Sequence, residues 1–348
     1  MIHIDGSQKS GSGTIVRFAV GLATLLDEEL HLTNIRAKRE KPGLRPQHLK
    51  AVEALQQICR GTLDGGEVGS NEIRFKPGGG VKGGDYEWNI GTAGSTTLLA
   101  MTLLPAACFS RGAMSFRISG GLFQDFAPSA YHIQNVLFPM LSQMGITAEL
   151  SIIRPGYVPR GDGVIEVRVE PVAGQIKPIS LLSQGDVVKI EGMAISSHLK
   201  ERRVSERMVE KCNQVLRSYG YQAQIEVVND TLALQRGAAL AVYAKTSFRG
   251  IVGADRAGAP RRTSEDIGKY VAGNLLEDLA TGATVDRYLA DQLIFYAALA
   301  DGVSQYRIPR LTEHVETNLW LVETILGAKT EVNHNLVEIQ GVGYFRRS

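Results

Sequence analysis

The sequence predicts an α+β fold made of three repeated modules, each with two helices and four strands, and interrupted once by a small α/β domain. The order strand, helix, strand, helix, strand, strand recurs at a spacing of roughly eighty residues. Residues 187–283 interrupt the third repeat and have an order of their own. We therefore expect a large domain of residues 1–186 and 284–348, in which helices cover one face of each sheet, and an inserted domain of residues 187–283.

The first module is predicted from the N-terminal part of the chain. Apolar residues at helical spacing indicate helices at 14–26 and 46–59. Pro46 suits the first turn of the second helix, and Gly61 suits the C-cap. Short apolar runs predict strands at 2–4, 29–35, 61–63 and 72–75.

The second module repeats this order. Helices are expected through 96–109 and from Pro128 to Gly145. Glycine and proline are frequent from Arg154 to Gly163, which favours a fixed loop, although a wide hairpin explains the composition as well. The predicted strands are 86–90, 114–119, 147–153 and 164–169.

The third module is split by the insertion. A strand near 178–182 precedes the insertion, and the pattern resumes at 285–299 as a helix. A last helix contains His314 and ends at Gly327, so all three modules have a helix followed by glycine. The remaining predicted strands are 303–308, 329–333 and 336–339.

The insertion contains the elements of a small α/β domain. Residues 198–203 form a charged loop, which reads as solvated surface, with RNA contact as the alternative. The predicted strands are 187–195, 224–228, 239–244 and 249–252, and the predicted helices are 204–219 and 264–279.

Composition limits the possible classes of protein. The chain has 348 residues, 44% of them hydrophobic and 21% charged, which is enough for a core and excludes a disordered chain. A net charge of +2 excludes a globally basic nucleic-acid coat, so any RNA contact must be local. Cys59, Cys108 and Cys212 are far apart in apolar patterns, which indicates buried thiols in a reducing compartment. No targeting or membrane-spanning segment is evident, so we expect a cytoplasmic protein without a membrane partner.

His314 is the main candidate for a nucleophile. Thr312 suits an N-cap, and the apolar spacing after it predicts a helix with His314 in its first turn. The positive end of the helix dipole lowers the proton affinity of the ring and favours an anion beside it. A neutral imidazole that faces a phosphate can act as a nucleophile, whereas a histidine that only caps or packs is the alternative.

Two glycine-rich turns and one basic loop are candidate anion sites. Residues 8–14 and 91–96 each lie between a strand and a helix, where backbone N–H groups can meet a phosphate, although ordinary tight turns explain them equally well. The loop 34–47 has five basic residues around a rigid Pro-Gly-Leu-Arg-Pro run, and Arg17 lies on a neighbouring predicted helix. We expect its guanidinium groups to bind phosphate, with a solvated loop as the alternative.

The predicted helix near residue 290 carries a candidate purine site. Tyr288, Asp291 and Gln292 fall on one helical face, which presents a ring for stacking and polar groups for a base or ribose. The solvated face of the helix is the alternative interpretation.

Taken together, these stretches resemble the RNA 3′-terminal phosphate cyclase family over nearly the whole chain. The residues that carry the resemblance, in order, are Asp5-Gly6, Arg17, Ile35-Arg36-Ala37, Arg39, Lys41-Pro42-Gly43-Leu44, Gln47-His48-Leu49, Gly83-Gly84-Asp85-Tyr86, Ala93-Gly94-Ser95, Gly156, Pro159, Tyr288-Leu289-Ala290-Asp291-Gln292-Leu293, His314 and Thr317-Asn318. The resemblance implies modules like the C-terminal domain of translation initiation factor three and a thioredoxin-like insertion.

The resemblance also implies a ligase-type enzyme of RNA processing that uses ATP and a divalent metal, Mg²⁺ or Mn²⁺. In this family a histidine attacks the α-phosphorus of ATP, AMP passes to an RNA 3′-phosphate, and the 2′-hydroxyl then closes a 2′,3′-cyclic phosphate. His314 matches the nucleophile. The matches to the adenylate pocket are Tyr288, Leu289, Ala290, Asp291, Gln292 and Met101, and those to the phosphate or RNA site are Arg17, Arg36, Arg39 and Gln47.

The chain departs from the family pattern at several positions. Ser10 stands where the family has a glutamate that helps to hold the metal, Met101 replaces a glutamine, and Asp162 interrupts a run of glycines. Loss of that glutamate leaves two alternatives open: a divergent nucleotidyl transferase, and a non-catalytic RNA-binding or ribosome-assembly protein on the same fold. An enolpyruvyl-transferase-type enzyme has similar repeats, but no phosphoenolpyruvate site is evident. Neither the natural RNA nor the oligomeric state follows from the sequence.

Overall fold

The computed structural model describes residues 1–346 and confirms an α+β protein. Its described strands form four separate sheets of four strands each. The first sheet has the order β1 (Ile2–Asp5), β2 (Leu30–Thr33), β4 (Ile73–Lys76) and β3 (Thr62–Asp64). The helices α1 (Gly13–Leu26) and α2 (Pro46–Cys59) connect its strands.

The end of α2 corrects one expectation. Arg60, at φ 55°, takes the left-handed position after the helix, and its N–H points to the carbonyls of Gln56 and Gln57. Gly61 follows without a positive φ, so it is not the C-cap. It is instead required by close packing, because a Cβ there would lie 2.5 Å from the carbonyl oxygen of Lys76.

The second sheet has the order β5 (Gly84–Asn89), β6 (Met114–Gly120), β8 (Gly163–Glu170) and β7 (Thr147–Arg154). The helix α3 (Thr96–Ala107) precedes β6. The second predicted helix is divided into α4 (Ala130–His132), a π-helical turn (Ile133–Leu137) and α5 (Phe138–Gln143). Pro139 has no N–H for regular helical bonding to residue 135, which accounts for the wider turn before it. The strands β7 and β8 are antiparallel, so the loop from Arg154 to Gly163 is the wide hairpin.

The third sheet joins strands from both sides of the insertion. Its order is β9 (Ser180–Leu181), β14 (Val303–Arg307), β16 (Leu336–Gln340) and β15 (Lys329–Asn333). The helix α8 (Leu289–Leu299) begins later than the predicted start at residue 285. The Asp286 carboxylate accepts the N–H groups of Tyr288 and Leu289, so the residues before Leu289 form a turn ahead of the regular helix. The helix α9 (Glu313–Leu326) begins after the Thr312 cap and ends at Gly327, as the sequence predicts.

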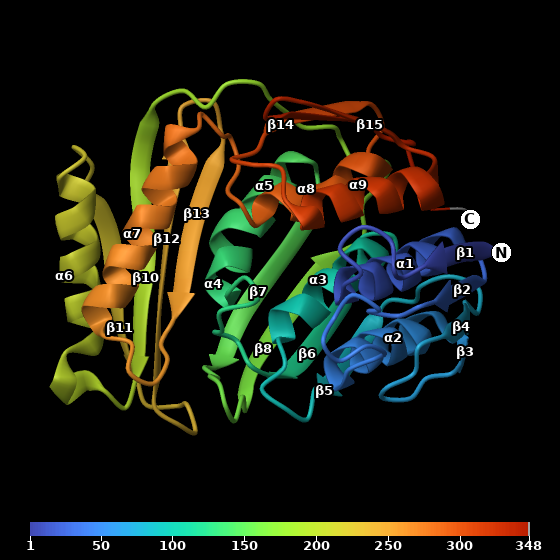
Figure 1. Cartoon of the computed structure of the whole chain (residues 1–348), viewed down its shortest axis with the longest axis horizontal. Coiled ribbons are helices and arrows are strands. Elements are labelled where there is room, and N and C mark those ends of the chain that lie inside the picture. Colours follow the sequence, from blue (N-terminus) through green and yellow to red (C-terminus); the bar gives the residue numbers. More distant parts are fainter. Residues whose placement is uncertain (347–348) are drawn as a thin grey trace.

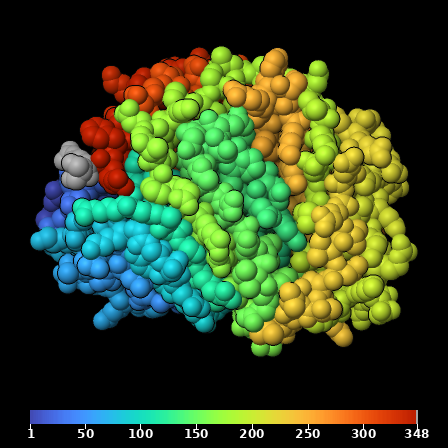
Figure 2. All heavy atoms as spheres, turned by 180° about the vertical axis from the view of Figure 1, so that it is seen from behind, coloured from blue at the N-terminus to red at the C-terminus, as the bar shows by residue number. Residues whose placement is uncertain are grey.

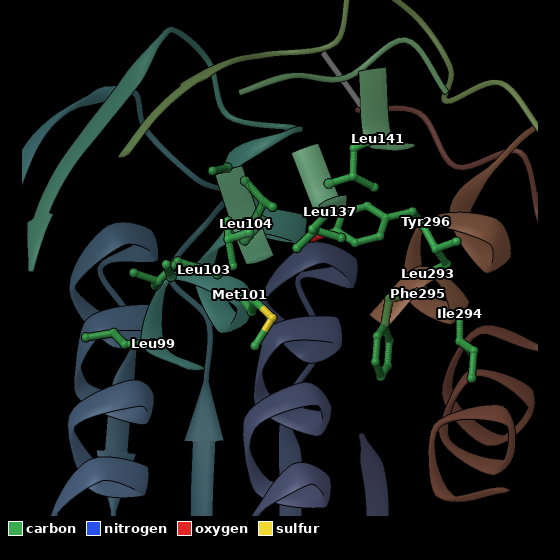
Figure 3. Close-up of a cluster of buried hydrophobic side chains, with 14 of the residues drawn as sticks. Leu99, Met101, Leu103, Leu104, Leu137, Leu141, Leu293, Ile294, Phe295 and Tyr296 are labelled. Carbon is green, nitrogen blue, oxygen red and sulfur yellow. The ribbon is translucent and has the colours of Figure 1, made fainter. Parts of the chain in front are cut away.

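These three sheets have the same strand order. In each, the chain enters at one edge, the second strand is parallel to the first, and the fourth strand lies between the second and the third. In Figure 1 the helices α1, α2, α3, α8 and α9 are gathered together, with strands of the sheets around them. Figure 3 shows part of this core, to which α3, the α4–α5 segment and α8 all contribute side chains, with Leu137 and Leu141 near the Tyr296 ring.

The fourth sheet lies within residues 187–283. Its order is β11 (Ala223–Asp230), β10 (Val187–Ser197), β12 (Gly237–Thr246) and β13 (Ile251–Ala257). The helices α6 (Val204–Arg217) and α7 (Ser264–Ala280) pack on it around a hydrophobic cluster that is separate from the main core. On the face seen in Figure 2, the central part of the chain lies between the N-terminal part and this segment.

The loop before α6 is exposed and contains a short 3₁₀ turn (Lys200–Arg202), in agreement with a solvated surface. Cys59, Cys108 and Cys212 are buried free thiols, as predicted. None of the helices in residues 1–346 combines the length and the apolarity needed to cross a bilayer.

Candidate active site

A cavity of about 530 Å³ collects residues from segments that are far apart in the sequence. Its lining comes from the start of α1, the loop before α2, α3, the segment 125–128, α8 and α9. Its volume falls within the range of about 300–1,000 Å³ that is typical of small-ligand sites. The predicted site residues that line it are His314, Tyr288, Asp291, Gln292, Met101, Arg17, Arg36, Arg39 and Gln47.

The first turn of α9 presents His314 to the cavity. The Thr312 hydroxyl accepts the N–H of Val315 and thereby caps the helix. The His314 ring is accessible at the cavity rather than sealed in the core. Desolvation in the cavity, followed by the charges of Arg17 and Arg39, lowers the pKa of His314 below its ordinary value of 6.5. His314 is therefore neutral at physiological pH, which is the form that a nucleophile requires.

Thr14 lies between His314 and Arg17. Its Oγ1 is 3.4 Å from His314 Nδ1 and accepts a hydrogen bond of 3.3 Å from Arg17 Nη2. Burial lowers the pKa of Arg17 to about 10, which still leaves its guanidinium charged at neutral pH. Thr14 therefore connects a neutral ring to a fixed cation, from opposite ends of the chain.

The turn 8–14 ends in a buried cluster of hydroxyl groups. The Oγ atoms of Ser10 and Ser12 are 2.9 Å apart, and the Ser10 N–H donates to Thr317 Oγ1 at 3.2 Å. These bonds join the start of α1 to α9, and they keep the Ser10 hydroxyl bonded to other hydroxyl groups of the protein. In residues 1–346, no group of three or more His, Cys, Asp and Glu side chains is arranged to share a metal ion.

The loop before α2 supplies a cationic wall. Arg36 adopts a left-handed backbone conformation at φ 56°, and its Nη1 donates to the carbonyls of Lys41 and Gly43 at 2.7 and 2.9 Å. These bonds hold the guanidinium in one place. Burial, followed by the charges of Arg45 and Arg39, lowers the pKa of Arg36. Like charges held together in this way favour an anion between them.

His48 is an uncharged member of this otherwise cationic wall. It lies in the first turn of α2, lines the cavity and is 4% exposed. Burial, followed by the charges of Arg17, Arg36 and Arg45, lowers the pKa of His48 to about 3, so the ring is neutral. A Cβ on Gly13 would lie 2.1 Å from its Nε2, so glycine at that position leaves room for the ring.

The start of α8 supplies the opposite wall. Burial raises the pKa of Asp291 to about 7, against the charge of Arg17, so this carboxyl group can donate as well as accept hydrogen bonds. Gln292 Oε1 and Asn318 Oδ1 have no hydrogen-bond partner among the described residues. Free polar atoms beside the Tyr288 ring suit a nucleobase or a ribose.

Some expected residues are not brought to the cavity. Leu289 and Ala290 are fully buried on the inward side of α8, so their side chains do not line it. The second glycine-rich turn, residues 91–96, also lies outside the lining, which leaves its interpretation as an ordinary tight turn. Helical geometry explains why Leu289 and Ala290 do not line the cavity, because successive residues of a helix cannot all face one side.

The sequence analysis missed several lining residues. They are Phe18, Leu98, Asp125, Phe126, Ala127 and Pro128, and His48 was noted there without a role. Asp125 is paired with Arg256 and Arg262 of the inserted segment, at 3.3 and 2.8 Å. The sequence offered one signal for this segment, the Asp-Phe-Ala-Pro run before a predicted helix. Proline and an isolated aromatic residue in a loop favour an exposed, fixed turn.

Comparisons with known proteins agree on one family. The sequence profile described as "RNA 3'-terminal phosphate cyclase" matches residues 8–332. The chain is 37% identical over 332 residues to a protein of that name from Methanothermobacter thermautotrophicus, a match that covers 95% of this chain and 96% of the relative. It is 36% identical over 348 residues to one from Korarchaeum cryptofilum, with 98% of each chain covered. It is 34% identical over 350 residues to one from Pyrococcus furiosus, with both chains covered in full.

Proposed function

The chain belongs to the RNA 3′-terminal phosphate cyclase family, and on that premise we propose that it converts an RNA 3′-phosphate to a 2′,3′-cyclic phosphate at the expense of ATP. The observation that carries the proposal is the convergence of His314 with Arg17, Arg36 and Arg39 on one cavity. Phosphoryl transfer needs a positioned nucleophile and cationic groups around the phosphates more than it needs acid–base groups.

In the first step, His314 Nε2 attacks the α-phosphorus of ATP and displaces pyrophosphate, which leaves AMP bound to the ring. The lowered pKa of His314 supports this role, because the attacking nitrogen must carry a lone pair. Thr14 Oγ1 has two lone pairs and can accept both the Nδ1–H of His314 and the Arg17 guanidinium. In the proposed tautomer the proton is on Nδ1, and Nε2 keeps its lone pair for the attack.

In the second step, an oxygen of the RNA 3′-phosphate attacks the AMP phosphorus, the P–N bond to His314 breaks, and an RNA–adenylate forms. In the third step, the 2′-hydroxyl attacks the 3′-phosphorus, releases AMP and closes the ring, while its proton passes to solvent. Arg17, Arg36, Arg39 and Gln47 would hold the phosphates through these steps, since they line the cavity that His314 faces.

The adenylate is proposed to lie against the start of α8. Tyr288 offers a ring for stacking, and Asp291 and Gln292 offer hydrogen-bonding groups. Met101 closes the apolar side of the same cavity. Leu289 and Ala290 contribute by packing: Ala290 accepts the Tyr306 hydroxyl through its carbonyl, which holds this turn of α8 in place.

We propose that a divalent metal, Mg²⁺ or Mn²⁺, enters the site bound to the triphosphate of ATP. The carboxyl and hydroxyl groups at the cavity do not fit a metal held by protein side chains: the Ser10 hydroxyl is engaged with Ser12, the pKa of Asp291 is raised to about 7, and Asp125 is paired with two arginines. The positive charge that the protein itself brings to the cavity therefore comes from its guanidinium groups.

We also infer that the three sheets outside residues 187–283 are copies of one module, of the kind found in the C-terminal domain of initiation factor three. Their shared strand order supports this interpretation. The separate hydrophobic cluster within residues 187–283 supports an inserted domain, and two helices on a mixed four-stranded sheet suit a thioredoxin-like one.

The test is the transfer of label from α-labelled ATP to the protein in the presence of Mg²⁺ or Mn²⁺, with a 3′-phosphorylated RNA then added to follow cyclisation. The native chain should form an acid-labile AMP adduct, and His314→Ala should form none. His334→Asn is the matched control, because His334 lies at φ 53° in the β15–β16 turn, where asparagine is tolerated. Absence of the adduct in folded native protein would refute the proposal, and RNA binding without AMP transfer would select the non-catalytic alternative.

A further inference from the structure

Phe126 is an exposed aromatic side chain at the rim of the cavity. It is 95% exposed, more than any other large hydrophobic side chain in residues 1–346, and it also lines the cavity that contains His314. A fully exposed phenyl ring has no packing role in the fold. Its place beside the cavity indicates a contact with something that enters or leaves it.

The backbone on both sides of Phe126 is fixed. Asp125 accepts two hydrogen bonds of 2.8 Å from Arg262, which lies in the inserted segment. On the other side, the Pro128 carbonyl accepts the Thr97 hydroxyl at 2.8 Å, and the Ser129 N–H donates to Asp255 at 2.7 Å. Because the neighbouring residues are anchored, a flat ligand that stacks on the ring has mainly the two side-chain torsions of Phe126 to order.

Charge at this rim is compatible with a polyanion. The carboxylate of Asp125 would repel phosphate if it were free, but Arg262 and Arg256 both pair with it and hold its pKa low. The segment therefore presents an apolar ring beside a neutralised carboxylate, on the same cavity as the cationic wall of Arg36 and Arg39.

We infer that Phe126 stacks on one of the last two bases of the RNA whose 3′-phosphate enters the cavity, and so acts as an RNA-binding residue. The inference rests on the function proposed above. Of the two substrates, the adenylate is assigned to the inner wall at Tyr288 and Gln292, whereas RNA must continue from the cavity into solvent and pass its rim. Bases stack readily on aromatic side chains, with little preference for sequence.

The first experiment separates binding of RNA from transfer of AMP. Phe126→Ala should weaken the Kd for a short 3′-phosphorylated RNA by about five-fold to a hundred-fold, the range expected for loss of one base–aromatic stack. Phe126→Trp should retain the affinity of the native chain. Phe248→Ala is the matched control, since Phe248 is 58% exposed in the β12–β13 turn and lies outside the cavity. Phe248→Ala should change neither the affinity for RNA nor the rate of AMP transfer to His314.

The second experiment is a double-mutant cycle with RNA that is abasic at the last or at the penultimate position. Removal of the stacked base should cost the native chain the same factor as Phe126→Ala, and the two changes together should cost no more than either alone. Additive losses at both positions would overturn the inference. So would a loss of AMP transfer in Phe126→Ala with normal RNA affinity, which would place adenine on the ring. A native chain that forms no AMP adduct yet shows the coupling would refute the proposed activity and keep the stacking contact.

Discussion

Two regions of this molecule hold a histidine in opposite electrostatic surroundings. At the cavity, His314 faces Arg17 and Arg39, and its pKa is lowered. At the junction of α4, β13 and α8, His132 is 1% exposed and lies 3.0 Å from the Asp286 carboxylate. Burial alone would lower the pKa of His132, but the charge and hydrogen bond of Asp286 outweigh it and raise the pKa.

The comparison shows that neighbours, rather than residue type, determine what each histidine does. Asp286 also accepts the N–H of Gly253 at 2.9 Å, so the His132–Asp286 pair connects α4 and the segment before α8 to β13. A protonated histidine can hold such a junction but cannot attack phosphorus, because it has no free lone pair. The neutral ring of His314 has the opposite properties. Each prediction below tests one side of this contrast.

The largest effect on stability is expected at the junction. Asp286→Ala leaves a buried histidine without its counter-charge, which costs about 3–5 kcal/mol in comparable buried pairs. Urea unfolding should show this loss in the free energy of unfolding. His314→Ala, at an accessible ring, should change stability by no more than about 0.5 kcal/mol. Equal stability of the two variants would contradict the contrast.

A smaller effect is expected from the group that orients the His314 ring. Thr14→Val removes the oxygen beside Nδ1 and should lower the rate constant of AMP transfer roughly ten-fold, as expected for loss of one hydrogen bond, with little change in the KM for ATP. Thr14→Ser should restore the rate. Thr24→Val is the matched control, because the Thr24 hydroxyl bonds within α1 to the carbonyl of Val20. A rise in KM with an unchanged rate constant would point to a binding role instead.

The pH dependence of AMP transfer should report the charge on His314. Because the pKa is lowered, the rate should stay constant as pH falls through 6.5, where an ordinary histidine is half protonated, and should decline only at more acidic pH. Arg39→Ala removes one of the charges that lower the pKa, so it should move the decline toward 6.5. Arg160→Ala, in the exposed β7–β8 hairpin, should leave the profile unchanged. A midpoint above 6.5 in the native chain would contradict the lowered pKa of His314.

The smallest effect is the pH dependence of stability at the junction. His132 has a raised pKa, so its contribution is complete below the ordinary value of 6.5 and is lost as pH rises through the raised value. The pKa of Asp286 is lowered, so its contribution is present above 3.8 and is lost as pH falls through the lowered value. The difference in unfolding free energy between the native chain and His132→Gln should therefore be greatest between pH 3.8 and 6.5. A difference that grows above that window would reverse the assigned sign.

Much of the local structure was predictable from the sequence because its causes are local. The Thr312 cap, the Gly327 end of α9 and the proline at the start of α2 each depend on a few neighbouring residues. The α2 end shows where this reasoning stops. Arg60 took the position expected for Gly61, because Gly61 has to avoid the carbonyl of Lys76 in β4, a residue that no local pattern connects to it.

The candidate site was predicted residue by residue but not as an arrangement. His314, Arg36 and the Tyr288 face were each identified from local chemistry or from the family resemblance, and all of them line the cavity. Phe126 and His132 were missed, since the Asp-Phe-Ala-Pro run indicates only an exposed turn and a histidine in an apolar helix has no distinctive pattern. Their roles depend on what lies across from them.

The sequence alone determined the secondary structure, the family and the residue types available for chemistry, because helix caps, hydrophobic periodicity and motif order are properties of neighbouring residues. Only the tertiary structure decided which histidine is neutral and which is paired with a carboxylate. It also brought Thr14 to within 3.4 Å of His314, across 300 residues of chain. The physical reason is that pKa values depend on burial and on nearby charges, and both are set when distant segments pack together.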